Sequence, residues 1–280
     1  MQTRINRVAA INWAQRNAVA ALLCALTIAG CEQPTQTPVM PVTLDPERPT
    51  VLITGSSRGI GLEITRQYAM KGWNVIATCR TPSNAADLQA IADEFPNVTI
   101  ERLDVTDFDR IDALAEKYRN QPIDVLLNNA GISGGRESQQ FGNLQYEVYN
   151  QVMAVNVLGP LKMVEAFMPN VEASDQKKII NISSGQGSIS STFGGQYFYR
   201  ASKAALNMVM RSLAVENKKA GITIGLVSPG FVRTDFTKGL DFPMMITPQE
   251  SGAAVVAVID NYGIEQTGTH VRHTGEPQKW

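Results

Sequence analysis

The feature that most constrains this chain is a glycine-rich turn after a short apolar stretch. Residues 51–53, Val-Leu-Ile, are typical of a buried parallel strand. Gly55, Gly59 and Gly61 follow with the spacing G-x-x-x-G-x-G, and residues 60–68 have the apolar period of a helix. Glycines allow a close approach of backbone to phosphate, and the free N–H groups of a helix N-terminus attract anions. This unit predicts a dinucleotide pyrophosphate site, although a glycine-rich turn alone is weak evidence.

The rest of the chain alternates predicted strands and helices. Strands are expected at 73–78, 98–103, 123–127, 178–182, 222–227 and 269–272. Helices are expected at 84–95, 107–118, 144–171 with a kink near Pro160, 199–218 and 248–261. Thr247, Pro248 and Glu250 mark the start of the last helix with a capping box. The alternation predicts an α/β fold, a doubly wound parallel sheet with helices on both faces, in a single domain from about residue 50 to 280.

Composition excludes several classes of function. The chain has 280 residues, of which 25 are basic and 26 acidic, so there is no charge reason to expect nucleic acid as a partner. Three cysteines are too few for a disulfide framework or a zinc site. The two histidines, His270 and His273, have no cysteine or acidic cluster beside them. We therefore expect an exposed histidine pair and no metal.

The N-terminal region has the order of segments that is typical of a bacterial lipoprotein. A leader with three arginines precedes residues 18–30, an apolar run shorter than the roughly 20 residues that span a bilayer. The run ends in Ala29-Gly30-Cys31, which resembles a lipobox. We predict a signal peptide at 1–30, a lipidated Cys31 with a Pro- and Thr-rich tether to residue 49, and a membrane-anchored protein on the periplasmic side. The alternative is an unprocessed leader on a cytoplasmic protein.

Tyr199 and Lys203 are the first candidates for chemistry. They lie four residues apart on a predicted helix, so their side chains share a face. A phenol has a pKa of about 10, and a nearby ammonium is expected to lower this pKa toward useful proton transfer. Ser184 follows a predicted strand at the carboxyl edge of the sheet, where ligands bind in such folds. A Tyr-x-x-x-Lys pair alone is most often a surface feature, so the accompanying serine and glycine turn carry weight.

Seven motifs in order support a family assignment. They are Thr54-Gly55-x-x-x-Gly59-x-Gly61, Leu103-Asp104-Val105, Asn128-Asn129-Ala130-Gly131, Asn156, Ser184, Tyr199-x-x-x-Lys203 and Pro229-Gly230-Phe231-Val232-Arg233-Thr234. In these motifs the chain resembles the short-chain dehydrogenase/reductase family from about residue 50 to its end. The segments Tyr199–Asn207 and Gly275–Trp280 resemble its C-factor or sniffer-like branch. The resemblance implies a Rossmann-type fold and hydride transfer between a nicotinamide and a carbonyl or alcohol substrate.

The resemblance also implies the roles of individual residues. Its catalytic set is Asn156, Ser184, Tyr199 and Lys203, with Asn156 holding a water near Lys203. Its cofactor set is Gly55, Ser57, Arg58, Gly59, Ile60, Gly61, Arg80, Asp104, Val105, Asn129, Ala130, Gly131, Tyr199, Lys203, Pro229, Gly230, Val232 and Thr234. Within that set the aspartate would contact adenine, the Asn-Ala-Gly segment would lie beside the ribose, and the threonine would hold the carboxamide. Members are commonly dimers or tetramers, so a homodimer or homotetramer is expected.

The end of the second strand predicts the choice of cofactor. An NAD site usually has an acidic residue there to bind the ribose 2′-OH. Here the strand runs into Arg80, and no acidic residue occurs before Asp87. Arg80 offers a planar fork for a 2′-phosphate, and Arg58 in the glycine turn can approach the same phosphate. NADP(H) is therefore predicted, with NAD(H) as the alternative.

Two assignments needed a choice between neighbours. Tyr197 also follows Ser184 at a separation close to that of the family, but an alanine stands four residues after it. Tyr199 has the lysine there, so we assign catalysis to Tyr199, a longer loop to residues 185–196 and the pocket wall to Tyr197. Ser184 is favoured over Ser183 because the family uses the second serine of such a pair. The two would point to opposite faces if strand alternation continues.

The substrate side is the least determined. Residues 236–247 are rich in Phe, Leu, Met and Ile and predict an apolar lid over the site, with ordinary core packing as the alternative. A lid of this kind favours an apolar or aromatic carbonyl compound, or the matching alcohol, as the small-molecule partner. A cofactor-binding signalling or regulatory protein on the same fold is the alternative function. The complete catalytic set favours an enzyme.

Overall fold

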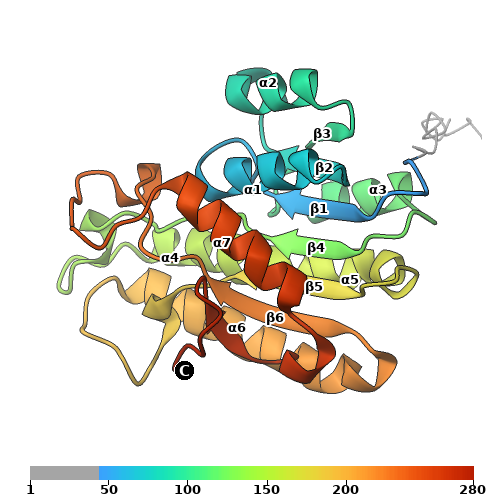
Figure 1. Ribbon diagram of the computed structural model, residues 1–280. Helices are drawn as coiled ribbons and strands as arrows, with labels where there is room; N and C mark the ends of the chain where they lie inside the picture. Colours follow the sequence, from blue (N-terminus) through green and yellow to red (C-terminus); the bar gives the residue numbers. More distant parts are fainter. Residues whose placement is uncertain (1–43) are drawn as a thin grey trace, which may run out of the picture. The chain divides into compact units, whose positions relative to one another are not determined.

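The sheet is the frame of the molecule. The computed structural model describes residues 44–280, and in this part of the chain seven parallel strands form one sheet in the order β3-β2-β1-β4-β5-β6-β7 (Figure 1). The strands are β1 (Thr50–Thr54), β2 (Asn74–Cys79), β3 (Val98–Arg102), β4 (Val125–Asn128), β5 (Lys178–Ile182), β6 (Thr223–Ser228) and β7 (His270–Arg272). The chain moves outward from β1 to β3 and then returns to β4 on the other side of β1. The predicted doubly wound sheet is thus confirmed, and its switch point lies between β1 and β4.

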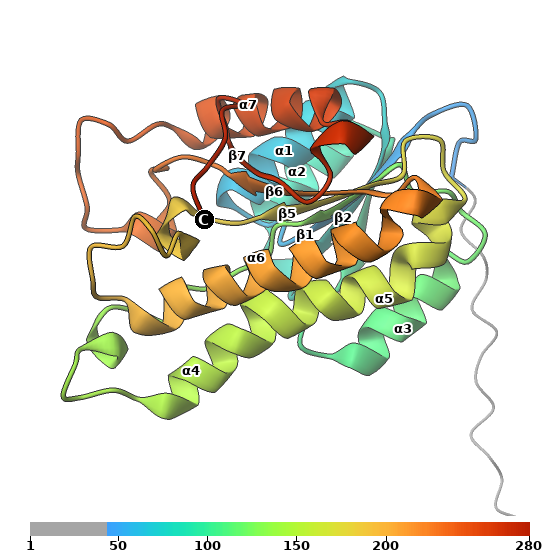
Figure 2. The same cartoon turned by 90° about the horizontal axis from the view of Figure 1, so that it is seen from below.

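Helices cover both faces of the sheet. They are α1 (Gly59–Met70), α2 (Ala86–Glu94), α3 (Phe108–Lys117), α4 (Tyr146–Met153), α5 (Gly159–Glu172), α6 (Tyr197–Asn217) and α7 (Pro248–Asn261). Figure 2 shows α1 and α7 on one side and α3, α5 and α6 on the other. In β1, Val51 and Ile53 join the core under α1 and α7, whereas Leu52 joins the core under α5 and α6. Successive side chains of β1 point to opposite faces, and helices cover both faces. The central strand is therefore buried along its whole length.

The predicted start of α7 is confirmed in detail. The Thr247 N–H donates to Glu250 Oε2 at 2.7 Å, and the Glu250 N–H donates to Thr247 Oγ1 at 3.2 Å. At the other end, Lys178 Nζ from β5 donates to the carbonyl oxygens of Ile259 and Asp260, at 2.8 and 3.1 Å. Both helix ends therefore have partners for backbone groups that the helix itself leaves free.

The predicted kink near Pro160 is a π-helical segment, Ala154–Leu158, between α4 and α5. Pro160 has no N–H to offer the Asn156 carbonyl four residues earlier, so the regular α-helical pattern cannot pass this point. The combined helix, Tyr146–Glu172, is the one described helix long and apolar enough to cross a membrane. Met163 and Phe167 nevertheless lie fully buried against the sheet, as expected for a core helix.

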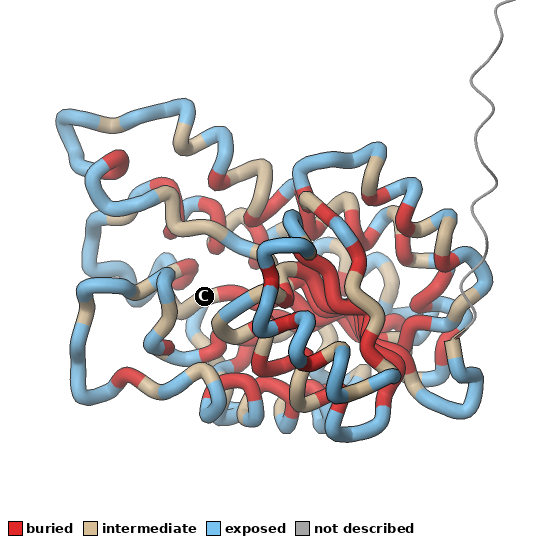
Figure 3. Tube along the Cα trace, turned by 90° about the horizontal axis from the view of Figure 1, so that it is seen from above, coloured by how far each residue is buried: buried red, intermediate tan, exposed pale blue. Residues whose placement is uncertain are grey.

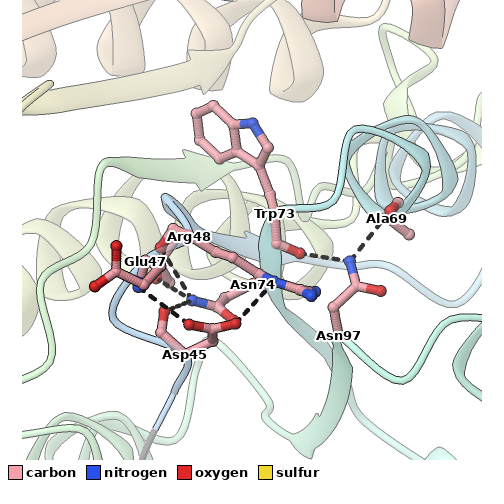
Figure 4. Close-up of polar contacts among 8 residues, drawn as sticks. Asp45, Glu47, Arg48, Ala69, Trp73, Asn74 and Asn97 are labelled. Carbon is pink, nitrogen blue, oxygen red and sulfur yellow. Dashed lines mark hydrogen bonds and ion pairs between the residues drawn. The ribbon is translucent and has the colours of Figure 1, made fainter.

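The folded part begins earlier than the sequence predicts. Residues 44–49, which the sequence assigns to the tether, form a turn whose carbonyl groups bind Asn74 (Figure 4). Asn74 Nδ2 donates to the oxygens of Asp45 and Arg48, at 2.8 and 3.1 Å, and Leu44 packs against the core. These contacts hold residues 44–49 on the domain, although their composition is typical of a tether. The predicted signal peptide, the lipidated Cys31 and the remainder of the tether lie outside the described residues.

Candidate active site

The glycine turn is shaped by direct contact with the end of β4. Gly55 has φ +73°, and a Cβ atom there would lie 2.9 Å from Ala130 Cα. A Cβ atom at Gly61 would lie 2.2 Å from the Gly55 carbonyl oxygen and 2.4 Å from Asn129 Nδ2. That same amide group donates to the carbonyl oxygens of Thr54 and Gly55, at 2.9 and 3.1 Å. These positions therefore exclude any side chain, and the turn is fixed by its neighbours.

The N-terminus of α1 opens at this turn. The helix begins at Gly59, its N-cap residue Arg58 makes no side-chain cap, and no acidic residue stands in its first turn. Its first N–H groups are therefore available to an anion. Ser57 is half-buried in the turn, and Ile60 packs against the core and anchors the helix start. The backbone here fits a pyrophosphate.

Two arginines at the ends of β2 and β3 both act on Asp104. Arg80 is exposed just after β2, and Arg102, also exposed, pairs in register with Cys79. Burial alone would raise the pKa of Asp104, but hydrogen bonds from Thr106 and the charges of Arg80 and Arg102 outweigh it and lower that pKa. Arg102 was missed by the sequence analysis. The register that pairs it with Cys79 was the missing information.

Arg58 has an ionic partner in the segment after β6. Its guanidinium forms an exposed ion pair at 3.2 Å with Asp235, which belongs to that segment. A Cβ atom at Gly59 would lie 3.4 Å from Thr234 Cγ2, so the segment approaches the glycine turn. That Arg58 and Arg80 face one phosphate stays a prediction.

The root of that segment is fixed. The Pro229 carbonyl oxygen accepts from Ser251 Oγ at 2.7 Å, and Val232 is buried and bridges to Ile246. Gly230 has φ +93°, and a Cβ atom there would lie 2.9 Å from Ile246 Cδ1. On the other side of the opening, Val105 is buried and its carbonyl oxygen would lie 2.9 Å from a Cβ atom at Gly159, the first residue of α5.

Tyr199 and Lys203 lie on α6 and are both buried. Lys203 Nζ donates to the Ile182 carbonyl oxygen at 2.8 Å and lies 5.8 Å from the centre of the Tyr199 ring. Burial lowers the pKa of Lys203 to about 8. Burial also raises the pKa of Tyr199 to about 12, although a hydrogen bond with the Ser184 side chain acts in the opposite direction. The predicted lowering by Lys203 is wrong for this structure, because the loss of water around the phenol dominates.

The two serines after β5 point in different directions. Ser184 is half-buried, its Oγ accepts from the Gln186 N–H at 3.1 Å, and it lies close enough to the Tyr199 phenol to lower its pKa. Ser183 is buried, and its Oγ donates to Asn207 Oδ1 at 2.6 Å, within the core under α6. This arrangement is the alternation that the sequence analysis expected. Only Ser184 lies beside the phenol.

The side chain of Asn156 joins the segment after β4 to α6. Its Oδ1 accepts from the Ile132 N–H, and its Nδ2 donates to the Ile132 carbonyl oxygen and to Ser202 Oγ, all at 2.9 Å. A Cβ atom at Gly131 would lie 3.3 Å from Asn156 Oδ1 and 3.7 Å from Lys203 Nζ, so these residues are neighbours. Oδ1 keeps a second lone pair, and the backbone carbonyl of Asn156 lacks its α-helical donor from Pro160. The water held by Asn156 stays a prediction.

An aromatic ring packs against Tyr199, and further aromatic side chains lie in loops nearby. Figure 3 shows that the loops projecting beyond the buried strands are largely exposed. The Phe236 ring packs edge-on against the Tyr199 ring with centroids 5.2 Å apart, and Tyr197 lies 6.1 Å from Phe141. Within residues 236–247, Phe236, Phe242 and Met244 are exposed and Met245 is buried. Most of this segment is thus not core packing. Its apolar side chains lie at the entrance.

His270 differs from expectation. It is buried, its Nε2 lies 2.8 Å from Ser228 Oγ, and its ring lies 5.7 Å from the ring of Trp280. Burial and, secondarily, the charge of Lys203 lower the pKa of His270 to about 4. The expectation of an exposed pair failed because the sequence does not show that the C-terminal segment folds back over β7.

Comparison with known proteins now gives the family. Residues 49–242 match the family described as short chain dehydrogenase. The chain is 34% identical over 238 residues to 1-hydroxy-2-glutathionyl-2-methyl-3-butene dehydrogenase of Rhodococcus sp. (strain AD45), covering 82% of this chain and 99% of the relative. It is 32% identical to NADPH-bound carbonyl reductase from chicken fatty liver, with a TM-score of 0.77 over 83% of this chain and 100% of that one.

A second solved structure supports the same assignment. Carbonyl reductase Sniffer of D. melanogaster is 30% identical, with a TM-score of 0.76 over 83% of this chain and 100% of its own. The predicted fold agrees with these matches. The protein is therefore a member of the short-chain dehydrogenase/reductase family of oxidoreductases.

Proposed function

We propose that the protein is an NADP(H)-dependent carbonyl reductase or alcohol dehydrogenase with Tyr199 as its general acid and base. One observation carries the proposal: a buried phenol has the Ser184 hydroxyl close enough to act on its pKa and lies near the Lys203 ammonium, at the carboxyl edge of the sheet. Similarity to an NADPH-bound carbonyl reductase supports it. A regulatory protein could lose Tyr199 without penalty, so the presence of the complete set favours an enzyme.

The residues of the glycine turn fit a dinucleotide. Glycine positions that exclude a side chain bring the backbone of the turn close to the end of β4, and the α1 N-terminus offers free N–H groups. Asp104 follows β3, and Asn129 and Gly131 follow β4, so all three lie at the carboxyl edge of the sheet with the glycine turn. When bound, the nicotinamide supplies or accepts the hydride. The chain itself positions the two reactants and moves the proton.

The proton chemistry follows from the two perturbed groups. A pKa of about 12 keeps the Tyr199 phenol protonated at neutral pH, so it can donate to a carbonyl oxygen that Ser184 also holds. Lys203, with a pKa of about 8, is mostly an ammonium at pH 7. It favours negative charge on the phenol oxygen after the proton has left. A water on the Asn156 carbonyl completes a path by which the proton is replaced.

A preference for NADP(H) follows from the arginines at the strand ends. Arg80 and Arg102 are exposed at the ends of neighbouring strands, and no acidic residue directly follows β2, where a ribose 2′-OH would be bound. The ion pair of Arg58 with Asp235 is exposed and therefore weak, so Arg58 can exchange this partner for a phosphate. Each charge-assisted hydrogen bond contributes about 1.5–3 kcal/mol. Two or three such hydrogen bonds to the 2′-phosphate suffice for a strong preference for NADP(H).

The entrance supports a bulky apolar or aromatic carbonyl compound as substrate. Phe236 contacts the Tyr199 ring, and Phe242 and Met244 extend the apolar surface into solvent. The test is turnover of a panel of aldehydes, ketones and quinones by the purified protein, with NADPH and NADH in parallel. We expect NADPH-dependent reduction of the larger apolar compounds. Tight NADPH binding without turnover of any of them would instead support the signalling or regulatory alternative.

We further propose that the mature protein is lipid-anchored at Cys31 on the periplasmic side. The support is sequence alone: the basic leader, the apolar run and the Ala29-Gly30-Cys31 junction. Because NADPH is made in the cytosol, either the enzyme binds its cofactor before export or the leader is not processed. Mass spectrometry of the N-terminus in membrane fractions tests the anchor. We expect a lipid-modified Cys31, and an intact Met1 or an unmodified Cys31 would refute it.

A further inference from the structure

The first turn of α6 has no cap from its own sequence. The N-cap residue, Gln196, has a left-handed backbone at φ 49° and ψ 45°, and its side chain makes no cap hydrogen bond. The first intrahelical hydrogen bond comes from the Arg200 N–H to the Gln196 carbonyl oxygen. The N–H groups of residues 197–199 therefore need partners from elsewhere. One of them belongs to Tyr199.

Gln139 supplies this cap from a distant part of the chain. It lies in the loop after β4 and is only 3% exposed. Its Oε1 accepts from the N–H groups of Phe198 and Tyr199, at 2.9 and 3.0 Å. Its Nε2 donates to the carbonyl oxygens of Ser133 and Gly135. A single buried amide thus joins the catalytic helix to the loop that follows the cofactor segment.

The same loop reaches Tyr199 by a second route. The Tyr199 carbonyl oxygen accepts from Ser202 Oγ at 2.7 Å, and Ser202 Oγ accepts in turn from Asn156 Nδ2 at 2.9 Å. Asn156 holds both backbone groups of Ile132. Both backbone groups of Tyr199 are therefore tied to residues 132–139, one through Gln139 and the other through Ser202.

We propose that Gln139 is a positioning residue for the reaction, which sets the place of the Tyr199 phenol relative to Ser184 and to the cofactor side of the opening. The inference rests on the proposed role of Tyr199. Its physical basis is that the amide satisfies four backbone groups at once, two on α6 and two on the loop. A methionine side chain of similar length makes none of these bonds, so the two α6 N–H groups and the Ser133 carbonyl oxygen lose this partner, while the Gly135 carbonyl oxygen keeps Ser138 Oγ. The helix start is then free to shift.

The first test replaces Gln139 by methionine and compares kinetics with NADPH and one carbonyl substrate. Gln139→Met keeps the length of the side chain and removes every hydrogen bond. We expect kcat to fall about tenfold or more, because the phenol is misplaced, while KM for NADPH changes less than about threefold. The matched control is Gln140→Met, since Gln140 is the exposed neighbour of the same residue type. Gln140→Met should leave kcat and the KM for NADPH unchanged.

The second test separates the two halves of the amide. Gln139→Glu keeps an acceptor for Phe198 and Tyr199 but loses the donors to Ser133 and Gly135. In hydrogen exchange, Gln139→Met should speed exchange of the Phe198 and Tyr199 amides. Gln139→Glu should leave these two protected, loosen residues 132–139, and retain more kcat than Gln139→Met. Gln139→Glu also carries the test alone should Gln139→Met fail to fold.

The outcomes distinguish the inference from the proposed function. If the parent protein reduces no carbonyl compound, the proposed function fails, while hydrogen exchange still tests the cap. If Gln139→Met turns over within about twofold of the parent, Gln139 does not position Tyr199. If Gln139→Glu exchanges at Phe198 and Tyr199 as fast as an uncapped helix end, the capping contact itself is refuted. Equal losses of kcat and of NADPH affinity would show a general structural role and would also overturn the proposal.

Discussion

Two regions at the carboxyl edge of the sheet are built in different ways. The glycine-turn side consists of residues 54–61 and 128–131, and the substrate side consists of the apolar loop residues Phe141, Phe193 and 236–247. On the glycine-turn side, backbones touch, and Thr54 Oγ1 accepts from the N–H groups of Asn129 and Ala130, at 3.0 and 3.1 Å. On the substrate side, large apolar side chains stand in solvent, with Phe141 85% exposed, Phe193 82% and Met244 72%.

The difference separates two kinds of recognition. The first side tolerates no added atom, because a Cβ at Gly61 would overlap both Gly55 and Asn129. It therefore suits one group of fixed shape, such as the pyrophosphate of a dinucleotide. The second side can exchange one apolar residue for another without disturbing a core, which suits a variable substrate. Tyr199 lies between the two, fixed by contacts on both sides.

The change that should separate binding from turnover most strongly is Tyr199→Phe. It removes the proton donor and keeps the ring against Phe236. We expect kcat to fall by about 10²–10⁴ with NADPH binding retained, measured by steady-state kinetics and by fluorescence titration. Tyr197→Phe is the matched control and should lose little. Near-normal turnover in Tyr199→Phe would remove this residue from the mechanism.

Gly61→Ala tests whether the glycine-turn side is as rigid as its contacts indicate. The added Cβ overlaps the Gly55 carbonyl oxygen, so the turn must open. We expect the free energy of unfolding to fall by about 1–3 kcal/mol and NADPH affinity to fall at least tenfold. Gly263→Ala is the control, because nothing lies within 4 Å of a Cβ there. Unchanged denaturation and binding in Gly61→Ala would mean that the turn yields easily.

Arg80→Asp should reverse the cofactor preference, by roughly ten- to a hundredfold in the NADPH/NADH ratio of kcat/KM. The carboxylate repels a 2′-phosphate and accepts from a ribose hydroxyl instead. Arg119→Asp, an equal charge change just after α3, should leave the ratio alone. Equal kcat/KM values for the two cofactors in the parent would defeat the argument. So would an Arg80→Asp ratio that matches the parent.

The buried His270 predicts an acid limit to stability. Its pKa of about 4 in the folded protein lies below the ordinary value of 6.5, so the unfolded chain binds the proton more readily. The stability from this group is present above about pH 6.5 and is lost as the pH falls toward 4. His270→Gln should flatten that slope, by up to about 1.4 kcal/mol per pH unit for one proton. Urea unfolding at several pH values measures it. Parallel slopes in parent and variant would contradict the assignment.

The smallest expected effect is on the substrate side. Phe236→Ala removes the edge-on contact with Tyr199 and part of the apolar entrance, so we expect KM for a large aromatic ketone to rise about two- to tenfold. KM for NADPH and the unfolding transition should stay as in the parent. Met70→Ala, an exposed apolar truncation at the end of α1, is the control. A loss of stability comparable to that of Gly61→Ala would erase the contrast between the two sides.

The positions of strands and helices were predicted better from the sequence than the burial and contacts of single residues. Strand and helix positions were predicted to within a few residues because each depends on a local apolar period and on local caps, as at Thr247 and Glu250. The pKa of Tyr199 and the exposure of His270 were predicted wrongly, because burial depends on segments far away in the sequence. Asn156 was placed correctly near Lys203, yet its amide binds Ile132, which no spacing rule indicates.

The sequence by itself determined the parallel α/β fold, the glycine turn and the Tyr199–Lys203 pair, because these follow from short-range periodicity and from residues that share one element. Only the tertiary structure decided that Arg102 pairs in register with Cys79, that Arg58 pairs with Asp235, and that Gln139 caps α6. Each of these contacts joins residues from different elements whose register and packing are set by the whole sheet. A polar side chain in a loop carries no local mark of the backbone groups that it will meet.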